Sequence, residues 1–204
     1  MEIARISTIA LISLLGAMSP GPDFAVVTKN CMLGTFRTGF FTALGVSTAL
    51  LIHVAYCLFG IAILIQDSPK IYHILMCFGS AYLFYMGIKL LKEKKVANEP
   101  TLSKEETSVI KRPFLSGFLC NLLNPKATLF IFSLFTQFID PNLSFYKKAI
   151  MGSTTAIIGL IWFTLLSYLI THRMLQKHIS RFQLAITKTM GVVLCVLAVY
   201  VVLQ

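Results

Sequence analysis

The sequence predicts an all-α integral membrane protein of six transmembrane helices, arranged as two inverted three-helix repeats. Its 204 residues are 56% hydrophobic and 13% charged, with a mean hydropathy of +0.79, whereas soluble domains carry about 25% charged residues. Its apolar segments have the length of about 20 residues that crosses a hydrocarbon core of roughly 30 Å. The first and the fourth of these segments are both interrupted at proline.

The charged residues delimit the six predicted spans. The first three spans are about Ile6–Thr28, Thr38–Gln66 and Ile71–Ile88, and the last three are Phe114–Ile139, Ala149–Thr171 and Phe182–Leu203. We therefore divide the chain into a first three-helix repeat (1–91), a cytoplasmic loop (92–113) and a second three-helix repeat (114–204).

The N-terminus is interpreted as part of the first span and not as a cleaved signal peptide. The n-region contains an acid, Glu2, and a single basic side chain, Arg5, and a proline directly follows the one cleavage-like site, Ala17-Met18-Ser19.

The distribution of basic residues predicts the orientation. Four lie on the side of the N-terminus: Arg5, Lys70, Lys147 and Lys148. Twelve lie on the opposite side: Lys29, Arg37, Lys89, Lys92, Lys94, Lys95, Lys104, Lys111, Arg112, Arg173, Lys177 and Arg181. Basic residues are in excess on the cytoplasmic side of membrane proteins, so both termini are predicted outside.

The two interruptions correspond to each other. Ser19-Pro20 in the first span and Asn124-Pro125 in the fourth lie 105 residues apart, and each places an N-cap-favouring residue before a proline suited to the first helical position. Because three helices precede the second copy, the halves are inverted, and paired interruptions in such folds mark a midplane binding site. The alternative is a pair of ordinary proline kinks.

Each interruption offers partners for both charges of a ligand. Proline has no N–H, so Pro20, Pro22 and Pro125 leave the carbonyl four residues earlier, such as that of Gly16 or Asn121, open to a cation. Beyond each break a half-helix begins, and its free N–H groups favour an anion. A zwitterionic amino acid therefore suits a site built from Ser19, Pro20, Gly21, Pro22, Asp23, Asn121, Asn124, Pro125 and Lys126.

Asp23 is the one acid of the eight that falls inside a predicted span. Placing a carboxylate inside the membrane costs a few kcal/mol or more of free energy, so such a residue is by default a candidate functional residue. Asp23 can pair with Lys126, bind a substrate ammonium group or exchange protons, or it can simply stabilise its half-helix N-terminus. His53, in the middle of the second span, is a second proton-coupling candidate, although a packing histidine fits equally well.

Other classes of function fit less well. The net charge of +10 lies in short loops beside apolar runs, which indicates membrane topology and not nucleic acid. The five cysteines occur singly and are expected to be apolar fillers, and no metal site, cofactor or catalytic residue is predicted. An intramembrane enzyme would need a nucleophile with a base, or paired carboxylates. A channel stays open as an alternative.

The motif Ser19-Pro20-Gly21-Pro22-Asp23, together with Leu123-Asn124-Pro125-Lys126-Ala127 and Gln137-Phe138, resembles the LysE/RhtB family of bacterial amino-acid exporters. The resemblance implies proton-driven efflux of amino acids or their derivatives across a bacterial inner membrane. Members differ in substrate, and distant relatives export metal ions, for which the chain lacks clustered Cys, His or acids. The expected partners are an amino acid and the lipid bilayer, with a homodimer left open, and the expected mechanism is alternating access.

Overall fold

The computed structural model describes residues 2–67, 69–92, 112–139, 143–171, 185, 187–189, 191–196 and 198–199, and its elements over this part of the chain are helices. They are α1 (Glu2–Met18), α2 (Pro22–Leu33), α3 (Phe36–Asp67), α4 (Pro69–Lys92), α5 (Pro113–Leu122), α6 (Pro125–Phe138) and α7 (Phe145–Thr171). A short apolar C-terminal helix follows at Thr187–Val196. The predicted loop 92–113 lies outside the described residues except at its ends, and so does much of the predicted span Phe182–Leu203.

Among the residues that the structure describes, two helices are long and apolar enough to cross a membrane by themselves. They are α3, over Phe36–Gly60, and α7, over Phe145–Thr171. They coincide with the predicted second and fifth spans. α7 begins four residues earlier than predicted, because the Lys148 N–H bonds the Ser144 carbonyl at 3.1 Å and so adds a turn ahead of the apolar stretch.

Two helix pairs meet the same test only when joined, and each pair is sharply bent. The angle is 60° between α1 and α2 and 61° between α5 and α6. α6 has Asn124 as its N-cap, whose side chain accepts from the Lys126 N–H at 3.0 Å, which confirms the predicted cap. The corresponding prediction for Ser19-Pro20 is wrong, because α2 begins at Pro22 after an N-cap at Gly21.

Ser19 belongs to the end of α1. Its N–H donates to the carbonyls of Leu15 at 3.1 Å and Gly16 at 3.3 Å, which closes the last turn of that helix. The prolines that occupy equivalent places in the two bent pairs are therefore Pro22 and Pro125, each the first residue of its second half-helix.

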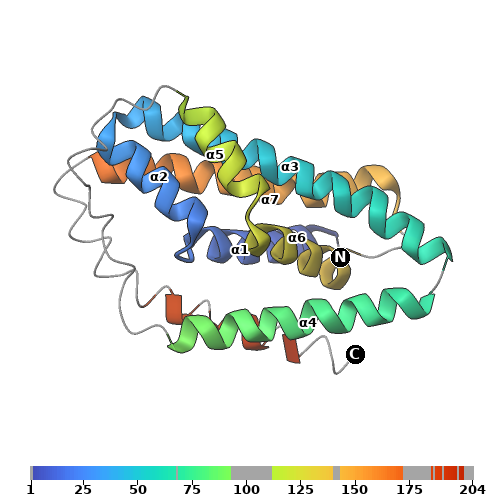
Figure 1. Cartoon of the computed structure of the whole chain (residues 1–204). Helices are drawn as coiled ribbons and strands as arrows, with labels where there is room; N and C mark the ends of the chain where they lie inside the picture. The colour runs from blue at the N-terminus through green and yellow to red at the C-terminus, as the bar shows by residue number, and fades with distance from the viewer. Residues whose placement is uncertain are drawn as a thin grey trace.

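The helices form three layers (Figure 1). The long helices α3 and α7 lie side by side in one layer, and α5 packs on α3. α1 packs on α7, and α6 packs on both α3 and α4, so these two half-helices occupy the middle. α4 and the C-terminal helix make up the third layer. Each bend therefore connects a half-helix of the middle layer, α1 or α6, to a half-helix that packs on α3, which is α2 or α5.

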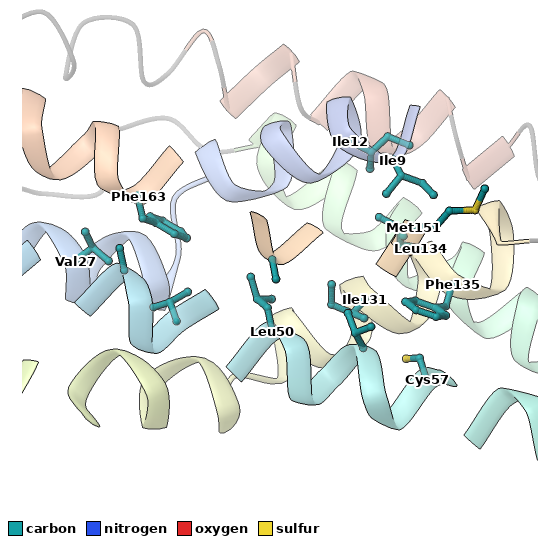
Figure 2. Close-up of a cluster of buried hydrophobic side chains, with 14 of the residues drawn as sticks. Ile9, Ile12, Val27, Leu50, Cys57, Ile131, Leu134, Phe135, Met151 and Phe163 are labelled. Atoms are coloured by element: carbon teal, nitrogen blue, oxygen red, sulfur yellow. The ribbon is translucent and has the colours of Figure 1, made fainter. Parts of the chain in front are cut away.

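Two hydrophobic clusters hold the layers together. The larger cluster takes buried side chains from α1, α2, α3, α6 and α7, and Figure 2 labels ten of them: Ile9, Ile12, Val27, Leu50, Cys57, Ile131, Leu134, Phe135, Met151 and Phe163. The smaller cluster joins α4 to the C-terminal segment through Leu83, Met86, Leu90, Leu194 and Ala198. Phe130 of α6 packs against both clusters and connects them.

Large apolar side chains also cover the outside of the bundle. Exposed examples from different helices are Leu11, Phe59, Phe78, Leu119 and Ile161. A continuous apolar exterior of this kind suits contact with lipid, where exposed hydrocarbon carries no hydration cost.

α3 and α5 touch backbone to backbone. A Cβ built at Gly45 would fall on the Phe114 carbonyl oxygen, and one built at Gly117 would fall on the Thr42 carbonyl oxygen. Small residues allow such close approach between membrane helices. Beside this contact, Asn30 Nδ2 lies 3.0 Å from Thr42 Oγ1 and 3.2 Å from Ser116 Oγ, donating to both. This contact fixes α5 to α3.

We expect Gly117→Ala to lower the stability of the protein, since the added methyl group meets the backbone of α3, which cannot rotate away. Overpacking of this kind costs about 1–3 kcal/mol. The matched control is Gly60→Ala, because a Cβ at Gly60 has no neighbour within 4 Å. The measurement is thermal unfolding of the purified proteins in detergent, and equal transition temperatures for the two variants would contradict the described contact.

Candidate functional site

A cavity of about 60 Å³ lies where the two bends meet. One ordered water needs about 10–15 Å³ by the same measure, so the space holds a small polar molecule or several waters. The cavity is lined by Ser13, Gly16, Ala17, Ser19, Gly21, Pro22, Asp23, Phe24, Leu50, Met86, Lys126, Ala127, Phe130, Thr155, Gly159, Phe163 and Leu194. Of the predicted site residues, the walls include Ser19, Gly21, Pro22, Asp23 and Lys126.

Asp23 is held by amides that come from the other bend. It is the second residue of α2, and its Oδ2 accepts hydrogen bonds from Asn121 Nδ2 at 3.0 Å and from Asn124 Nδ2 at 3.1 Å. Its second oxygen, Oδ1, is buried and has no hydrogen-bond partner among the described residues. One carboxylate oxygen is thus fixed by the protein, and the other is buried without a hydrogen bond from the described residues.

Lys126 is held by groups that come from the first bend. It is the second residue of α6, and its Nζ donates to Ser19 Oγ at 2.9 Å and to the Pro20 carbonyl at 3.0 Å. The ammonium group also lies over Gly21, where a Cβ would come within 3.0 Å of Nζ. Because glycine has no side chain, the lysine ammonium group can occupy the space beside Gly21.

The electrostatic environments of the two charges differ. Asp23 lies in the first turn of α2, where the helix dipole favours an anion. Lys126 lies in the first turn of α6, where the dipole disfavours a cation. Its contacts with Ser19 and the Pro20 carbonyl, just past the C-terminus of α1, offset that cost because carbonyls at helix ends attract cations.

The carbonyls that proline was predicted to leave open have partners, so that expectation is wrong at two positions. The Gly16 carbonyl accepts from the Ser19 N–H at 3.3 Å, and the Asn121 carbonyl accepts from the Asn124 N–H at 3.0 Å. Both helix ends tighten into shorter turns that use these oxygens. The Pro20 carbonyl meets the lysine instead.

His53 is connected to the site through the backbone of Asn121. The imidazole is 2% exposed, and its Nε2 lies 3.2 Å from the Asn121 carbonyl oxygen. Because a carbonyl only accepts, Nε2 is the donor, and Nδ1 has no partner among the described residues. His53 thus lies behind the amide that binds Asp23, and not on the cavity wall.

The remaining predicted residues have supporting positions. Pro125 starts α6 and is exposed, and Asn121 and Asn124 are buried at 1% and 4% exposure. The prediction omitted Ser13 and Thr155, which line the cavity and share a hydrogen bond of 3.1 Å. Both are hydroxyls in the middle of apolar segments, but their proximity across 142 residues is not visible in the sequence.

Metal-binding geometry is absent from the part of the chain that the structure describes, where no three His, Cys, Asp or Glu side chains come together.

Comparisons with known proteins identify the family. The profile of the LysE type translocator family matches residues 14–204. A threonine efflux protein of Escherichia coli (strain K12) is 27% identical over 176 residues, covering 85% of each chain. A threonine efflux protein of Salmonella typhi is 28% identical over 167 residues, covering 79% of this chain and 80% of its own.

A third relative, the uncharacterized membrane protein YrhP of Bacillus subtilis (strain 168), is 26% identical over 191 residues, covering 90% of this chain and 91% of its own. No solved structure matches the chain significantly. Because the family profile spans nearly the entire sequence, the chain belongs to the LysE type translocator family and is a multi-pass membrane transporter, not an enzyme.

Proposed function

We propose that the protein exports amino acids or their derivatives from the cytoplasm across the bacterial inner membrane. Family membership and the threonine efflux relatives support an amino-acid exporter. The observation that carries the proposal is that Asp23 and Lys126, one from each bend, line the same cavity. A zwitterionic amino acid presents the two opposite charges that this pair of side chains attracts.

In the proposed complex, Asp23 accepts from the α-ammonium group of the substrate through Oδ1, the buried oxygen that has no hydrogen-bond partner among the described residues. Lys126 provides the positive charge for the α-carboxylate. The amides of Asn121 and Asn124 keep the aspartate in place and so act as positioning residues. The Asp23–Lys126 pair has no net charge, and a zwitterionic substrate adds none. This neutrality limits the free-energy cost of burying the loaded site in the membrane.

The transport cycle is proposed to be alternating access driven by the proton gradient. Each bent pair, α1–α2 and α5–α6, is taken as one broken span, and with α3, α4, α7 and the C-terminal segment this makes six spans in two inverted repeats. Asp23 is the proton carrier in this scheme and His53 the second candidate, since it contacts the Asn121 that binds Asp23.

We expect Asp23→Asn and Lys126→Ala each to reduce amino-acid efflux by at least about tenfold, because each removes one charge that the zwitterion needs in a desolvated site. The measurement is counterflow of labelled threonine in proteoliposomes, and growth of cells in toxic amino-acid analogues provides a second assay. Lys89→Ala is the control, since Lys89 lies in the last turn of α4 and outside the cavity.

Unchanged efflux in both variants at normal membrane levels would refute the proposed site. Saturable counterflow distinguishes this carrier from a channel, which would give flux that does not depend on substrate on the opposite side.

The orientation can be tested separately with fusions to alkaline phosphatase, which is active only outside the cytoplasm. Because the excess of basic residues is placed in the cytoplasm, we expect a fusion after Gln204 to be active and a fusion after Lys92 to be inactive. The opposite pattern would contradict termini outside.

A further inference from the structure

We propose that Ser13 and Thr155 form the subsite for the substrate side chain, and that this hydroxyl pair selects small, neutral amino acids with a hydroxyl group. The inference rests on the proposed function, since it takes the α-ammonium and α-carboxylate groups to be bound by Asp23 and Lys126. Ser13 belongs to α1 and Thr155 to α7, and both side chains line the cavity. They are 2% and 4% exposed.

The bond between Ser13 and Thr155 differs from the usual hydroxyl bonding in this bundle. Several other helical hydroxyls donate to the carbonyl four residues earlier in their own helix, as Thr48, Thr154 and Ser167 do. Ser13 Oγ donates across the cavity wall to Thr155 Oγ1 at 3.1 Å. Two hydroxyls together provide two donors and four acceptor sites, and this bond uses one of each. The pair therefore keeps a donor and several acceptor sites for a ligand.

The position of the pair matches a short side chain. Ser13 lies inside α1, whereas Ser19 lies just past the C-terminus of that helix. Lys126 Nζ contacts Ser19, so the carboxylate end of the substrate lies at that end of the cavity. The hydroxyl pair and the lysine thus line the same cavity at different positions along α1. A substrate whose carboxylate is bound by Lys126 can therefore direct its side-chain hydroxyl toward Ser13 and Thr155.

The charges in the cavity exclude basic and acidic side chains. Asp23 is the single acid and Lys126 the single base among the lining residues, and the zwitterion engages both. A third charge at the Ser13–Thr155 end would be buried among apolar groups such as Leu50 and Phe163 without a counter-charge, which is costly. A neutral side chain carries no such penalty.

The walls limit the size of the side chain. A Cβ at Gly16 would come within 2.7 Å of the Phe130 ring, and a Cβ at Gly159 would come within 3.0 Å of Leu50 Cδ1. Both glycines line the cavity, so its apolar side chains already pack directly on helix backbone there. Little free space remains to accommodate a long side chain.

The test compares threonine with its isostere valine, and both with lysine, as labelled substrates of the purified full-length protein in proteoliposomes. We expect the wild type to export threonine about tenfold faster than valine, the effect of one satisfied hydrogen bond in a buried site, and lysine more slowly still. Ser13→Ala and Thr155→Val should each bring the threonine-to-valine ratio close to one, by lowering threonine efflux while valine efflux persists.

The matched controls are Ser7→Ala on α1 and Thr154→Val on α7, whose hydroxyls bond the carbonyls of Ile3 and Ile150 and which lie outside the cavity. They should keep the wild-type ratio. Persistent valine efflux shows that a variant is folded. A wild-type ratio in Ser13→Ala and Thr155→Val, or lysine efflux equal to that of threonine, overturns the subsite and leaves the exporter intact. Absence of all amino-acid efflux from the wild type overturns the proposed function and the subsite together.

Discussion

The site depends on one reciprocal set of hydrogen bonds between the two bends. The carboxylate of Asp23, which begins α2, is bound by the amides of Asn121 and Asn124 at the other bend, and Lys126, which begins α6, is bound by Ser19 and Pro20 at the first. These four hydrogen bonds each join one bent pair to the other. These side-chain hydrogen bonds therefore form only when both bends face each other, whereas the carbonyls of Gly16 and Asn121 are satisfied within their own turns.

Much of this arrangement could be predicted from the sequence because it depends on residues that are rare in apolar segments. Proline marks where a helix must stop, and a carboxylate, a lysine and two amides beside the prolines identify the polar contacts. The exact helix starts could not be predicted. Ser19 is a good N-cap by type, but the last turn of α1 uses its N–H, and α2 begins at Pro22. The presence of proline predicts that a helical N–H donor is missing. It does not predict the shorter turn in which the Ser19 N–H bonds the Gly16 carbonyl instead.

The Ser13–Thr155 pair escaped prediction for a different reason. A serine or threonine inside a membrane helix normally bonds its own helix, so a hydroxyl in the sequence gives no evidence of a contact with another helix. Only the packing of α1 against α7 brings the two oxygens within 3.1 Å. The role of a charged or helix-breaking residue can be predicted from local sequence. The role of a neutral polar residue depends on which side chains the fold places beside it.

The backbone contact between α3 and α5 has a consequence for biosynthesis. During translation α3 enters the membrane well before α5, and until then Gly45 has no backbone to pack on and the Asn30 amide lacks Ser116. Asp23 likewise lacks the hydrogen bonds from Asn121 and Asn124 until α5 and α6 are inserted. The first three helices alone would therefore present unsatisfied polar groups to lipid, which makes them a poor independent folding unit and a natural target for membrane chaperones and proteases until the second half is inserted.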